Sequence, residues 1–216
     1  MLPDFYEERK RMVARQLHSR GIRDQRILDA FESVPRHLFV PEEFESSAYD
    51  DRPLPIGFGQ TISQPFIVAY MMQLLDLTGT ERVLEVGTGS GYVAAILSAL
   101  AAEVHTIELI PALADRARKT LATLGTKHVF THIGDGSQGW TESAPYDAII
   151  VSAAAPRVPT SLLDQLADGG RMILPVGESG FQELELWQRE GDSFSHETLL
   201  PVAFVPLRGE DGVWTN

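Results

Sequence analysis

Short apolar runs alternate with segments of helical periodicity along the second half of the chain. Runs that are rich in β-branched residues and have the length of buried strands occupy residues 83–87, 103–108, 129–133 and 146–151. Helical periodicity follows the first and second of these runs, over residues 92–102 and 111–124. Strands that alternate with helices in this way predict a parallel sheet with helical crossover connections.

The pattern changes towards the C-terminus. A helix over residues 159–167 and a fifth strand over residues 171–176 continue the alternation. Two further strands are expected over residues 183–188 and 195–205, because Glu190-Gly191-Asp192 between them is a hairpin signal. The whole pattern predicts an α/β fold, in which a Rossmann-like, doubly wound and mostly parallel sheet ends in an antiparallel strand pair.

The first 80 residues lack this alternation and predict an N-terminal helical cap. Residues 4–20 are expected to form an amphipathic helix. Its apolar side consists of Phe5, Met12, Val13 and Leu17. Asp24 is the expected N-cap of a second helix that continues through Phe31, and Val34-Pro35 ends that helix.

Residues 48–65 are predicted to form a long irregular segment that folds over a ligand. Loops of this length inside a compact domain are usually functional or disordered, and the apolar residues Ile56, Phe58 and Ile62 favour an ordered one. Ser63 has two compatible interpretations. It is either the N-cap of a helix over residues 66–75 or a ligand contact.

The composition excludes several classes of function. The chain has 216 residues, of which 44% are hydrophobic, and a net charge of −12, which does not favour non-specific nucleic-acid binding. The absence of cysteine excludes disulfides and thiolate metal sites and favours a cytoplasmic protein. No apolar run approaches the roughly 20 residues that span a bilayer. Residues 1–11 also lack the apolar core of a signal peptide.

A glycine cluster after the first strand marks the expected ligand site. In an open α/β sheet, the turn that contains Gly87, Gly89 and Gly91 is where a nucleotide-like ligand binds. A dinucleotide fingerprint would need glycine at the position of Tyr92, so the pattern differs from that of nicotinamide enzymes. Glu85, at the end of the strand, suits a positively charged ligand such as S-adenosyl-L-methionine (AdoMet) better than a pyrophosphate.

Acidic residues at the next two strand ends complete an adenosine site in this prediction. Glu108 lies 21 positions after Gly87, where a carboxylate can accept hydrogen bonds from both ribose hydroxyls. Asp135, between Gly134 and Gly136, is expected either to accept from an adenine amino group or to form an Asx turn.

Two other kinds of site are not predicted. The six histidines have no spacing typical of a metal site, and they are interpreted as surface or packing residues. Ser152 does not lie in a Gly-x-Ser-x-Gly elbow, so a hydrolase is unsupported.

Two segments resemble known methyltransferases. Residues 85–92 resemble motif I of class I AdoMet-dependent methyltransferases, and Glu108 and Asp135 match the acidic positions that follow this motif. Residues 56–65 resemble the signature loop of the protein-L-isoaspartate O-methyltransferase family, whose serine matches Ser63. Supporting similarities lie at residues 36–41, 134–136, 139–140 and 204–207. Phe66 and Ala203 depart from the pattern, because tyrosine and arginine are common there in bacterial members.

The resemblance implies methyl transfer from AdoMet to the α-carboxyl of L-isoaspartyl residues in damaged proteins and peptides, which initiates repair to aspartyl. Ser63 is then the expected catalytic residue. The implied cofactor-binding residues are Glu85, Gly87, Thr88, Gly89, Gly91, Glu108, Asp135 and Gly136. The implied substrate loop contributes Ile56, Gly57, Thr61, Ile62 and Gln64. No metal, nucleic acid or membrane is expected.

We expect a single domain over residues 1–216, with the cap and substrate loop in residues 1–80 and the Rossmann-like core in residues 81–216. The protein is expected to be a cytoplasmic monomer. Three alternatives share part of the pattern. They are a methyltransferase for a small molecule or RNA, a nicotinamide-dependent Rossmann oxidoreductase, and a non-catalytic AdoMet-binding module. The loop over residues 56–65 and the acidic charge do not favour RNA, and a non-catalytic module has no need of the loop.

Overall fold

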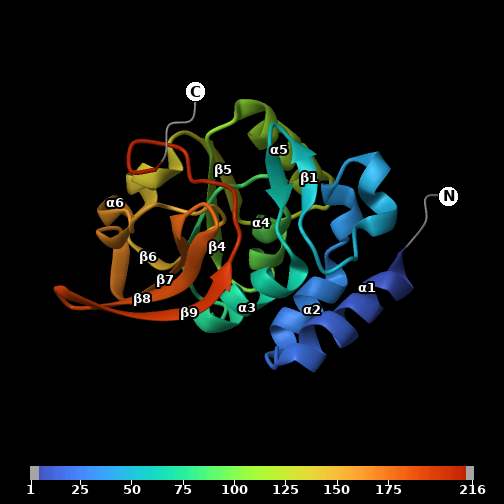
Figure 1. Ribbon diagram of the computed structural model, residues 1–216, viewed down its shortest axis with the longest axis horizontal. Coiled ribbons are helices and arrows are strands. Elements are labelled where there is room, and N and C mark those ends of the chain that lie inside the picture. The colour runs from blue at the N-terminus through green and yellow to red at the C-terminus, as the bar shows by residue number, and fades with distance from the viewer. Residues whose placement is uncertain (1–4, 213–216) are drawn as a thin grey trace.

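The computed structural model describes residues 5–212, and a seven-stranded sheet lies at the centre of that part of the chain (Figure 1). Its strands lie in the order β5-β4-β3-β6-β7-β8-β9. Their bounds are β3 Arg82–Val86, β4 Glu103–Glu108, β5 Val129–Ile133, β6 Tyr146–Val151, β7 Leu166–Glu178, β8 Phe181–Glu190 and β9 Ser193–Val202. The pairs among β3 to β7 are parallel, and β8 and β9 add antiparallel pairs. The predicted Rossmann-like, mostly parallel sheet is therefore confirmed.

Apolar clusters cover both faces of the sheet. Val83 of β3 belongs to a large cluster that includes side chains of α4 (Tyr92–Leu97) and α5 (Pro111–Thr123). Leu84, the next residue, belongs to a second cluster that includes side chains of α6 (Thr160–Leu163). Because both faces are covered, β3 is apolar at most positions rather than at every second one.

β4, β5 and β6 have the predicted bounds, but α4 is shorter than expected. It ends at Leu97 rather than at residue 102. The chain turns back there towards β4, and the N–H groups of Ala102 and Glu103 both donate to the carbonyl oxygen of Glu81. This long-range contact, rather than helix propensity, sets the end of the helix.

α6 is also shorter than expected and ends at Leu163 rather than at residue 167. The carbonyl oxygen of Gln165 accepts from the N–H of Tyr146 at 2.8 Å, and Leu166 already belongs to β7. Pairing with β6 therefore takes over residues that the periodicity assigned to the helix.

The segment predicted to be irregular contains a hairpin. β1 (Leu54–Gly57) pairs antiparallel with β2 (Gln60–Ile62). Gly57, Phe58 and Gly59 form the turn with φ values of 89°, 55° and 71°, a conformation that glycine adopts without strain. The expectation of an irregular segment was wrong over these residues, because the prolines of the segment mask its strand pattern.

The helix after the hairpin, α3 (Pro65–Leu75), starts close to the predicted position. Its N-cap is Gln64, which makes no side-chain capping bond, so the interpretation of Ser63 as the cap is wrong. A residue from outside the helix satisfies the first turn instead. The Asp51 carboxylate accepts from the Phe66 N–H at 3.2 Å.

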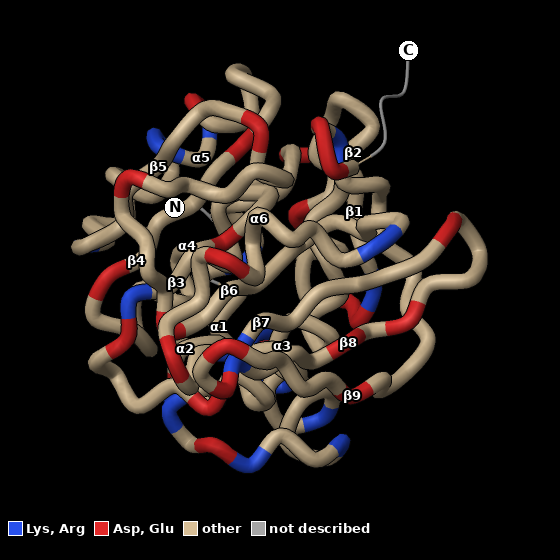
Figure 2. The backbone as a smooth tube through the Cα atoms, turned by 90° about the vertical axis from the view of Figure 1, so that its left-hand side faces the viewer, with Lys and Arg blue, Asp and Glu red and all other residues tan. Residues whose placement is uncertain are grey.

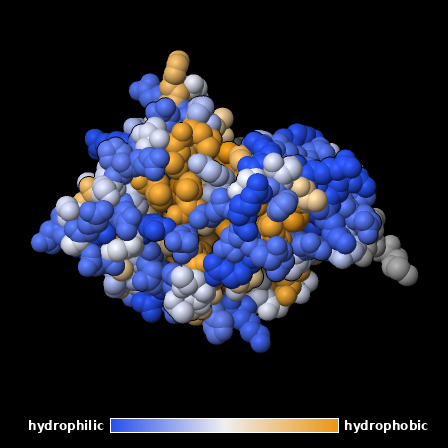
Figure 3. Space-filling model, turned by 90° about the horizontal axis from the view of Figure 1, so that it is seen from below, coloured by the Kyte–Doolittle hydropathy of each residue, from blue (hydrophilic) through white to orange (hydrophobic). Residues whose placement is uncertain are grey.

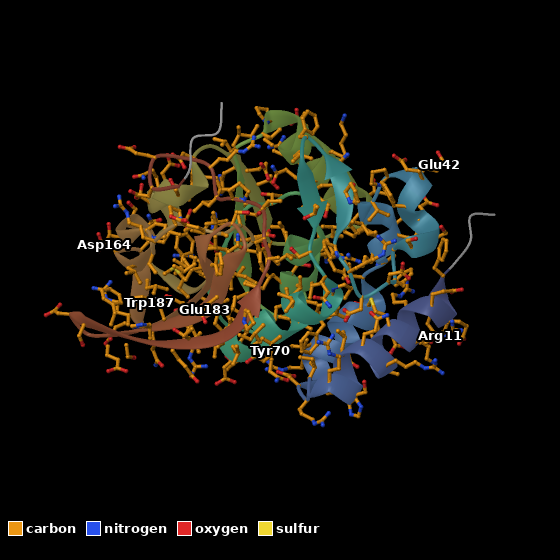
Figure 4. All side chains as sticks on the ribbon, viewed as in Figure 1. Arg11, Glu42, Tyr70, Asp164, Glu183 and Trp187 are labelled. Atoms are coloured by element: carbon orange, nitrogen blue, oxygen red, sulfur yellow. The ribbon has the colours of Figure 1, made fainter. Side chains whose placement is uncertain are left out.

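The antiparallel part of the sheet is larger than predicted. The expected hairpin at residues 190–192 is present between β8 and β9, but β7 also pairs antiparallel with β8. β7 has 13 residues and begins five positions before the predicted strand, at Leu166, with an irregular register against β6 between Leu166 and Arg171. In Figure 4, the labelled residues Glu183 and Trp187 mark this extension, and Arg11 and Glu42 mark the cap on the opposite side.

The N-terminal cap consists of short helices. The helix predicted over residues 4–20 is present as α1 (Tyr6–Met12), followed by a π-helical segment (Val13–Leu17) and a 3-10 turn (His18–Arg20), and Asp4 lies outside the described residues. α2 (Gln25–Ser33) begins as predicted, because the Asp24 side chain accepts from the Arg26 N–H. Two 3-10 helices follow, at Arg36–Phe39 and Glu42–Ser47.

Charged residues are spread over many elements in Figure 2, and the acidic ones do not gather into one patch in that view. Within residues 5–212, no helix has both the length and the apolar composition needed to cross a membrane.

Candidate active site

A cleft with an empty volume of about 750 Å³ lies at the carboxyl ends of β3, β4 and β6. β4 and β6 pair with β3 on opposite sides. The order in which strands are added to the sheet therefore reverses at β3. Open α/β sheets bind ligands at such a switch point. The cleft is lined by the glycine loop, the β1–β2 hairpin, the ends of the strands and residues 205–208.

The glycine loop contributes Gly87, Thr88 and Gly89 to the cleft lining, and Gly91 lies outside that lining. Gly91 has φ of 89°, and a Cβ there would lie 3.1 Å from the Ala117 Cβ of α5. A glycine is therefore needed where α4 begins against α5. Gly136 also lines the cleft, and a Cβ on it would lie 2.7 Å from a methyl group of Val86.

Glu108 lies in the cleft at the end of β4 and is 7% exposed. Its two carboxylate oxygens accept from backbone N–H groups of Gly89 at 2.8 Å and of Ile110 at 3.0 Å. These bonds fix the carboxylate between the glycine loop and the start of α5. Each oxygen keeps a further lone pair for a ligand hydroxyl.

Glu85 also lines the cleft, and it is fully buried. Its Oε2 accepts from the Thr106 hydroxyl at 2.6 Å, and Oε1 has no hydrogen-bond partner among the described residues. Burial raises the pKa of Glu85 to about 8, the Thr106 hydrogen bond lowers it, and the neighbouring Glu108 carboxylate raises it. A buried carboxylate with an unused oxygen is suited to a cationic ligand.

Asp135 does not line the cleft. Its Oδ1 accepts from the backbone N–H and the hydroxyl of Ser137, at 2.9 Å and 2.7 Å, which is the Asx turn that the sequence allowed. Its Oδ2 accepts from the N–H of Glu210 at 2.7 Å. The contact of Asp135 with an adenine amino group remains a prediction.

The β1–β2 hairpin covers the glycine loop. Ile56 is fully buried, and its terminal methyl group lies 3.4 Å from where a Cβ of Gly89 would be. The carbonyl oxygen of Ile56 accepts from the guanidinium of Arg116 on α5. Gly57 forms the turn, and Ile62, Thr61 and Ser63 contribute to the cleft lining.

A second, mostly apolar groove with an empty volume of about 840 Å³ adjoins the cleft. Thr61 and Ser63 line both spaces and therefore form the wall that the cleft and the groove share. The rest of the groove lining is Pro53, Gln64, Ile67, Pro201, Val202, Ala203 and Phe204. Figure 3 shows apolar surface gathered on the side of the molecule where β9 and α3 lie.

Residues 205–208 were not predicted as part of the site, although residues 204–207 were noted as a similarity to known methyltransferases. Val205, Pro206, Leu207 and Arg208 all line the cleft. A parallel bridge between Ala154 and Pro206 holds this segment beside the end of β6. Its position depends on contacts about 50 residues apart in sequence, so local pattern could not reveal it.

Two of the histidines form a pair that the sequence did not indicate. His105 and His132, on neighbouring strands, are 2.9 Å apart at their ring nitrogens, and the other nitrogen of His105 lies 2.7 Å from Glu103. Burial lowers the pKa of His132 to about 4, with repulsion from His105 as a smaller cause. No cluster of three metal-ligating side chains occurs within residues 5–212.

These features fit AdoMet. The cleft offers two carboxylates, Glu85 and Glu108, and Arg208 is the single cationic side chain in its lining among the described residues. Glu85 has a buried oxygen without a partner, which suits a ligand that carries an ammonium and a sulfonium. Glu108 offers the acceptor for vicinal hydroxyls.

Comparisons with known proteins give a consistent result. A family model described as "Protein-L-isoaspartate(D-aspartate) O-methyltransferase (PCMT)" matches residues 7–212. A protein-L-isoaspartate O-methyltransferase of Roseiflexus sp. (strain RS-1) is 54% identical over 98% of this chain and 96% of the relative. Protein-L-isoaspartate O-methyltransferase 1 of Rhodopseudomonas palustris (strain HaA2) is 53% identical over 98% of this chain and 87% of the relative.

Solved structures agree with the sequence relatives. A protein-L-isoaspartate O-methyltransferase superimposes with a TM-score of 0.86 at 29% identity, over 94% of this chain and 66% of the other. A Plasmodium falciparum protein described as a protein-L-isoaspartate O-methyltransferase, in complex with S-adenosyl-L-homocysteine, superimposes with a TM-score of 0.80 at 25% identity. That match covers 93% of this chain and 98% of the other.

Proposed function

The chain belongs to the protein-L-isoaspartate(D-aspartate) O-methyltransferase family, and from this premise we propose how its own residues carry out the reaction. The enzyme transfers a methyl group from AdoMet to the carboxylate of L-isoaspartyl residues in proteins, the first step of their repair to aspartyl. Family membership sets aside the oxidoreductase and the methyltransferases of other substrate classes.

We assign the cofactor to the cleft. Glu108 would accept from the ribose hydroxyls, and Glu85 would face the cationic end of the cofactor. Gly87, Thr88, Gly89 and Gly136, which line the cleft, would form the close-fitting floor, and Gly91 would support it where α4 packs against α5. Asp135 would lie beside the adenine. When bound, AdoMet supplies a methyl group activated by a sulfonium, with a neutral thioether as leaving group.

The observation that carries the substrate assignment is that Ser63 lies in the wall shared by the cleft and the apolar groove. A carboxylate held at Ser63 would lie next to the cofactor, and the rest of its polypeptide would extend along the groove. Ile67, Val202 and Phe204 offer apolar contacts for residues that flank the isoaspartate. The groove has Ala203 at the position where arginine is common in bacterial members of the family.

The reaction needs no general base. The nucleophile is the free α-carboxyl of the isoaspartyl residue, and a carboxyl with a pKa of about 4 is ionised at pH 7. The residues act by holding and aligning the nucleophile, which can contribute roughly 7–11 kcal/mol. The hydroxyl of Ser63 and nearby backbone N–H groups would replace water around the carboxylate. The hairpin, closed over Gly89 by Ile56, would exclude bulk water.

The direct test compares two peptides that differ only in aspartate and isoaspartate. Labelled AdoMet should give base-labile methyl incorporation into the isoaspartyl peptide alone. Incorporation into both peptides, or into neither while AdoMet is still bound, would contradict the substrate assignment and leave the cofactor assignment intact.

The Ser63→Ala variant should lower kcat/KM for an isoaspartyl peptide by about 10- to 100-fold, because one hydrogen bond to a charged group is lost. The affinity for AdoMet, measured by calorimetry, should change by less than about twofold, since this hydroxyl is assigned to the peptide. Ser143→Ala, whose hydroxyl lines neither space, is the matched control. An unchanged kcat/KM would remove Ser63 from the mechanism.

Binding of AdoMet should release a proton from Glu85 below pH 8. Because the pKa of Glu85 is about 8 in the free enzyme, the group is mostly protonated at pH 7, and a cationic ligand favours its ionised form. Affinity should therefore rise as pH increases towards 8. Calorimetry at pH 7 in two buffers of different ionisation enthalpy should find up to about one more proton released by the wild type than by Glu85→Gln.

Proton release by the wild type must be compared with that by Glu85→Gln, because the α-amino group of the cofactor also titrates near pH 8 and contributes to both. Glu142→Gln, an exposed acid outside the cleft lining, should behave as the wild type. Equal proton release by the wild type and Glu85→Gln would show that Glu85 does not face the cationic end.

We also propose that the enzyme acts as a monomer in the cytoplasm. The absence of cysteine supports a reducing compartment. Sedimentation at micromolar concentration and fractionation of the source cells test the two statements separately.

A further inference from the structure

Three buried side chains at the cofactor cleft, Thr88, Thr106 and Glu85, are hydrogen-bonded in series. The Thr88 and Thr106 hydroxyl oxygens lie 2.6 Å apart, and the Thr106 hydroxyl donates to Glu85 Oε2, also at 2.6 Å. Thr106 is fully buried in β4, opposite Glu85 of β3 in the register of the sheet, and Thr88 is 3% exposed. Thr106 itself does not line the cleft.

These hydrogen bonds determine which oxygen of Glu85 is left for a ligand. Oε2 is occupied by Thr106, whereas Oε1 is buried and has no partner among the described residues. A carboxylate on a rotatable side chain would otherwise present either oxygen. Since Oε2 is held inside the sheet and Glu85 lines the cleft, Oε1 is the oxygen that is left for a ligand.

The same hydrogen-bonded threonines can accommodate both protonation states of Glu85. With the carboxylate ionised, Thr88 donates to Thr106 and Thr106 donates to Oε2. With Oε2 protonated, the carboxyl donates to Thr106, and Thr106 donates to Thr88. Each hydroxyl is both a donor and an acceptor, so the change needs only rotation of hydroxyl protons.

We propose that Thr106, supported by Thr88, is a positioning residue that holds Glu85 with Oε1 directed at the cationic end of AdoMet. The inference rests on the proposed role of Glu85 in cofactor binding. It adds a residue of β4 that does not line the cofactor cleft. Glu108, the charged group that faces Glu85, is held separately by Gly89 and Ile110.

A double-mutant cycle tests the proposal. AdoMet binding is measured by calorimetry for the wild type, Thr106→Val, Glu85→Gln and the double variant. Thr106→Val should raise the Kd about tenfold, because Glu85 loses the hydrogen bond that favours its ionised form. In the Glu85→Gln background the same substitution should change the Kd by less than about twofold. Thr106→Ser, which keeps the hydroxyl, should stay within about threefold of the wild type.

The pH dependence separates positioning from a merely structural role. The affinity for AdoMet should rise with pH in both proteins, but in Thr106→Val it should level off at a higher pH than in the wild type, because Glu85 has lost the hydrogen bond that favours its ionised form. Additive effects in the cycle, an unshifted pH profile, or an equal loss in Thr106→Ser would each overturn the proposal. If Thr106→Val does not fold, Thr106→Cys, a weak donor of similar size, takes its place in the cycle.

The cycle does not depend on the methyl acceptor. If the wild type failed to methylate the isoaspartyl peptide, the proposed function would fail while the binding data still decided the role of Thr106. If Glu85→Gln left AdoMet affinity unchanged, the premise about Glu85 and the proposal would both be overturned.

Discussion

Replacing Glu108 with alanine should weaken AdoMet binding by at least about 100-fold. The carboxylate is assigned to two ribose hydroxyls, and hydrogen bonds to a charged group contribute about 1.5–3 kcal/mol each. It also holds the N–H groups of Gly89 and Ile110, so its loss loosens the glycine loop. Calorimetric titration with AdoMet measures the effect directly.

A ligand-side comparison separates ribose recognition from loop support. An S-adenosyl-L-homocysteine analogue without ribose hydroxyls should bind the wild type and Glu108→Ala with nearly the same affinity, apart from the contribution of the loop. Asp115→Ala, which removes an exposed acid of α5 that pairs with Arg118, is the control and should have little effect. If the loss were as large for the deoxy analogue as for the parent ligand, the ribose assignment would be wrong.

Replacing Arg36 with alanine should lower the free energy of unfolding by about 3–5 kcal/mol. The side chain is fully buried in the cap, and its Nε donates to the carbonyl oxygen of Ala48 at 2.7 Å. The guanidinium also lies 5.0 Å from the centre of the Tyr92 ring, at the start of α4. Burial lowers the pKa of Arg36 to about 10. Alanine would leave a cavity and an unpaired carbonyl between the cap and the glycine-loop helix.

Thermal unfolding provides the measurement, with an expected decrease in Tm of about 6–20 °C for a chain of this size. Arg52→Ala removes an exposed arginine whose partner Asp50 is also exposed, and it should cost less than about 1 kcal/mol. Arg36→Met keeps most of the volume, so its difference from Arg36→Ala measures the cavity rather than the charge. Equal stability of Arg36→Ala and Arg52→Ala would contradict a structural role for the buried cation.

The sequence determined the strands of the sheet well. β4, β5 and β6 have the predicted bounds, and turn residues flank them. β4 and β6 are central strands that are buried on both faces, whereas β5 is the edge strand and is only partly buried. The sequence did not determine the ends of α4 and α6. Helical periodicity continues past both ends, and pairing with distant backbone groups, such as that of Gln165 with Tyr146, stops the helices.

Most of the predicted site residues line the cleft, because glycines and acids at strand ends must meet at one edge of a parallel sheet. Glu85, Glu108, Gly87 and Gly89 line the cleft, whereas Gly91 lies outside its lining. The hairpin was missed because Pro53 and Pro55 mask the alternation of Leu54 and Ile56, which are buried against the core.

Only the tertiary structure decided the remaining contacts of the site. Glu210 bonds to Asp135 across 75 positions, Thr106 bonds to Glu85 across 21, and residues 205–208 close the cleft from the far end of the chain. Each contact joins segments whose sequences carry no mutual signal. Periodicity and turn chemistry report short-range preferences, whereas the partner of a buried polar group is chosen by the fold that buries it.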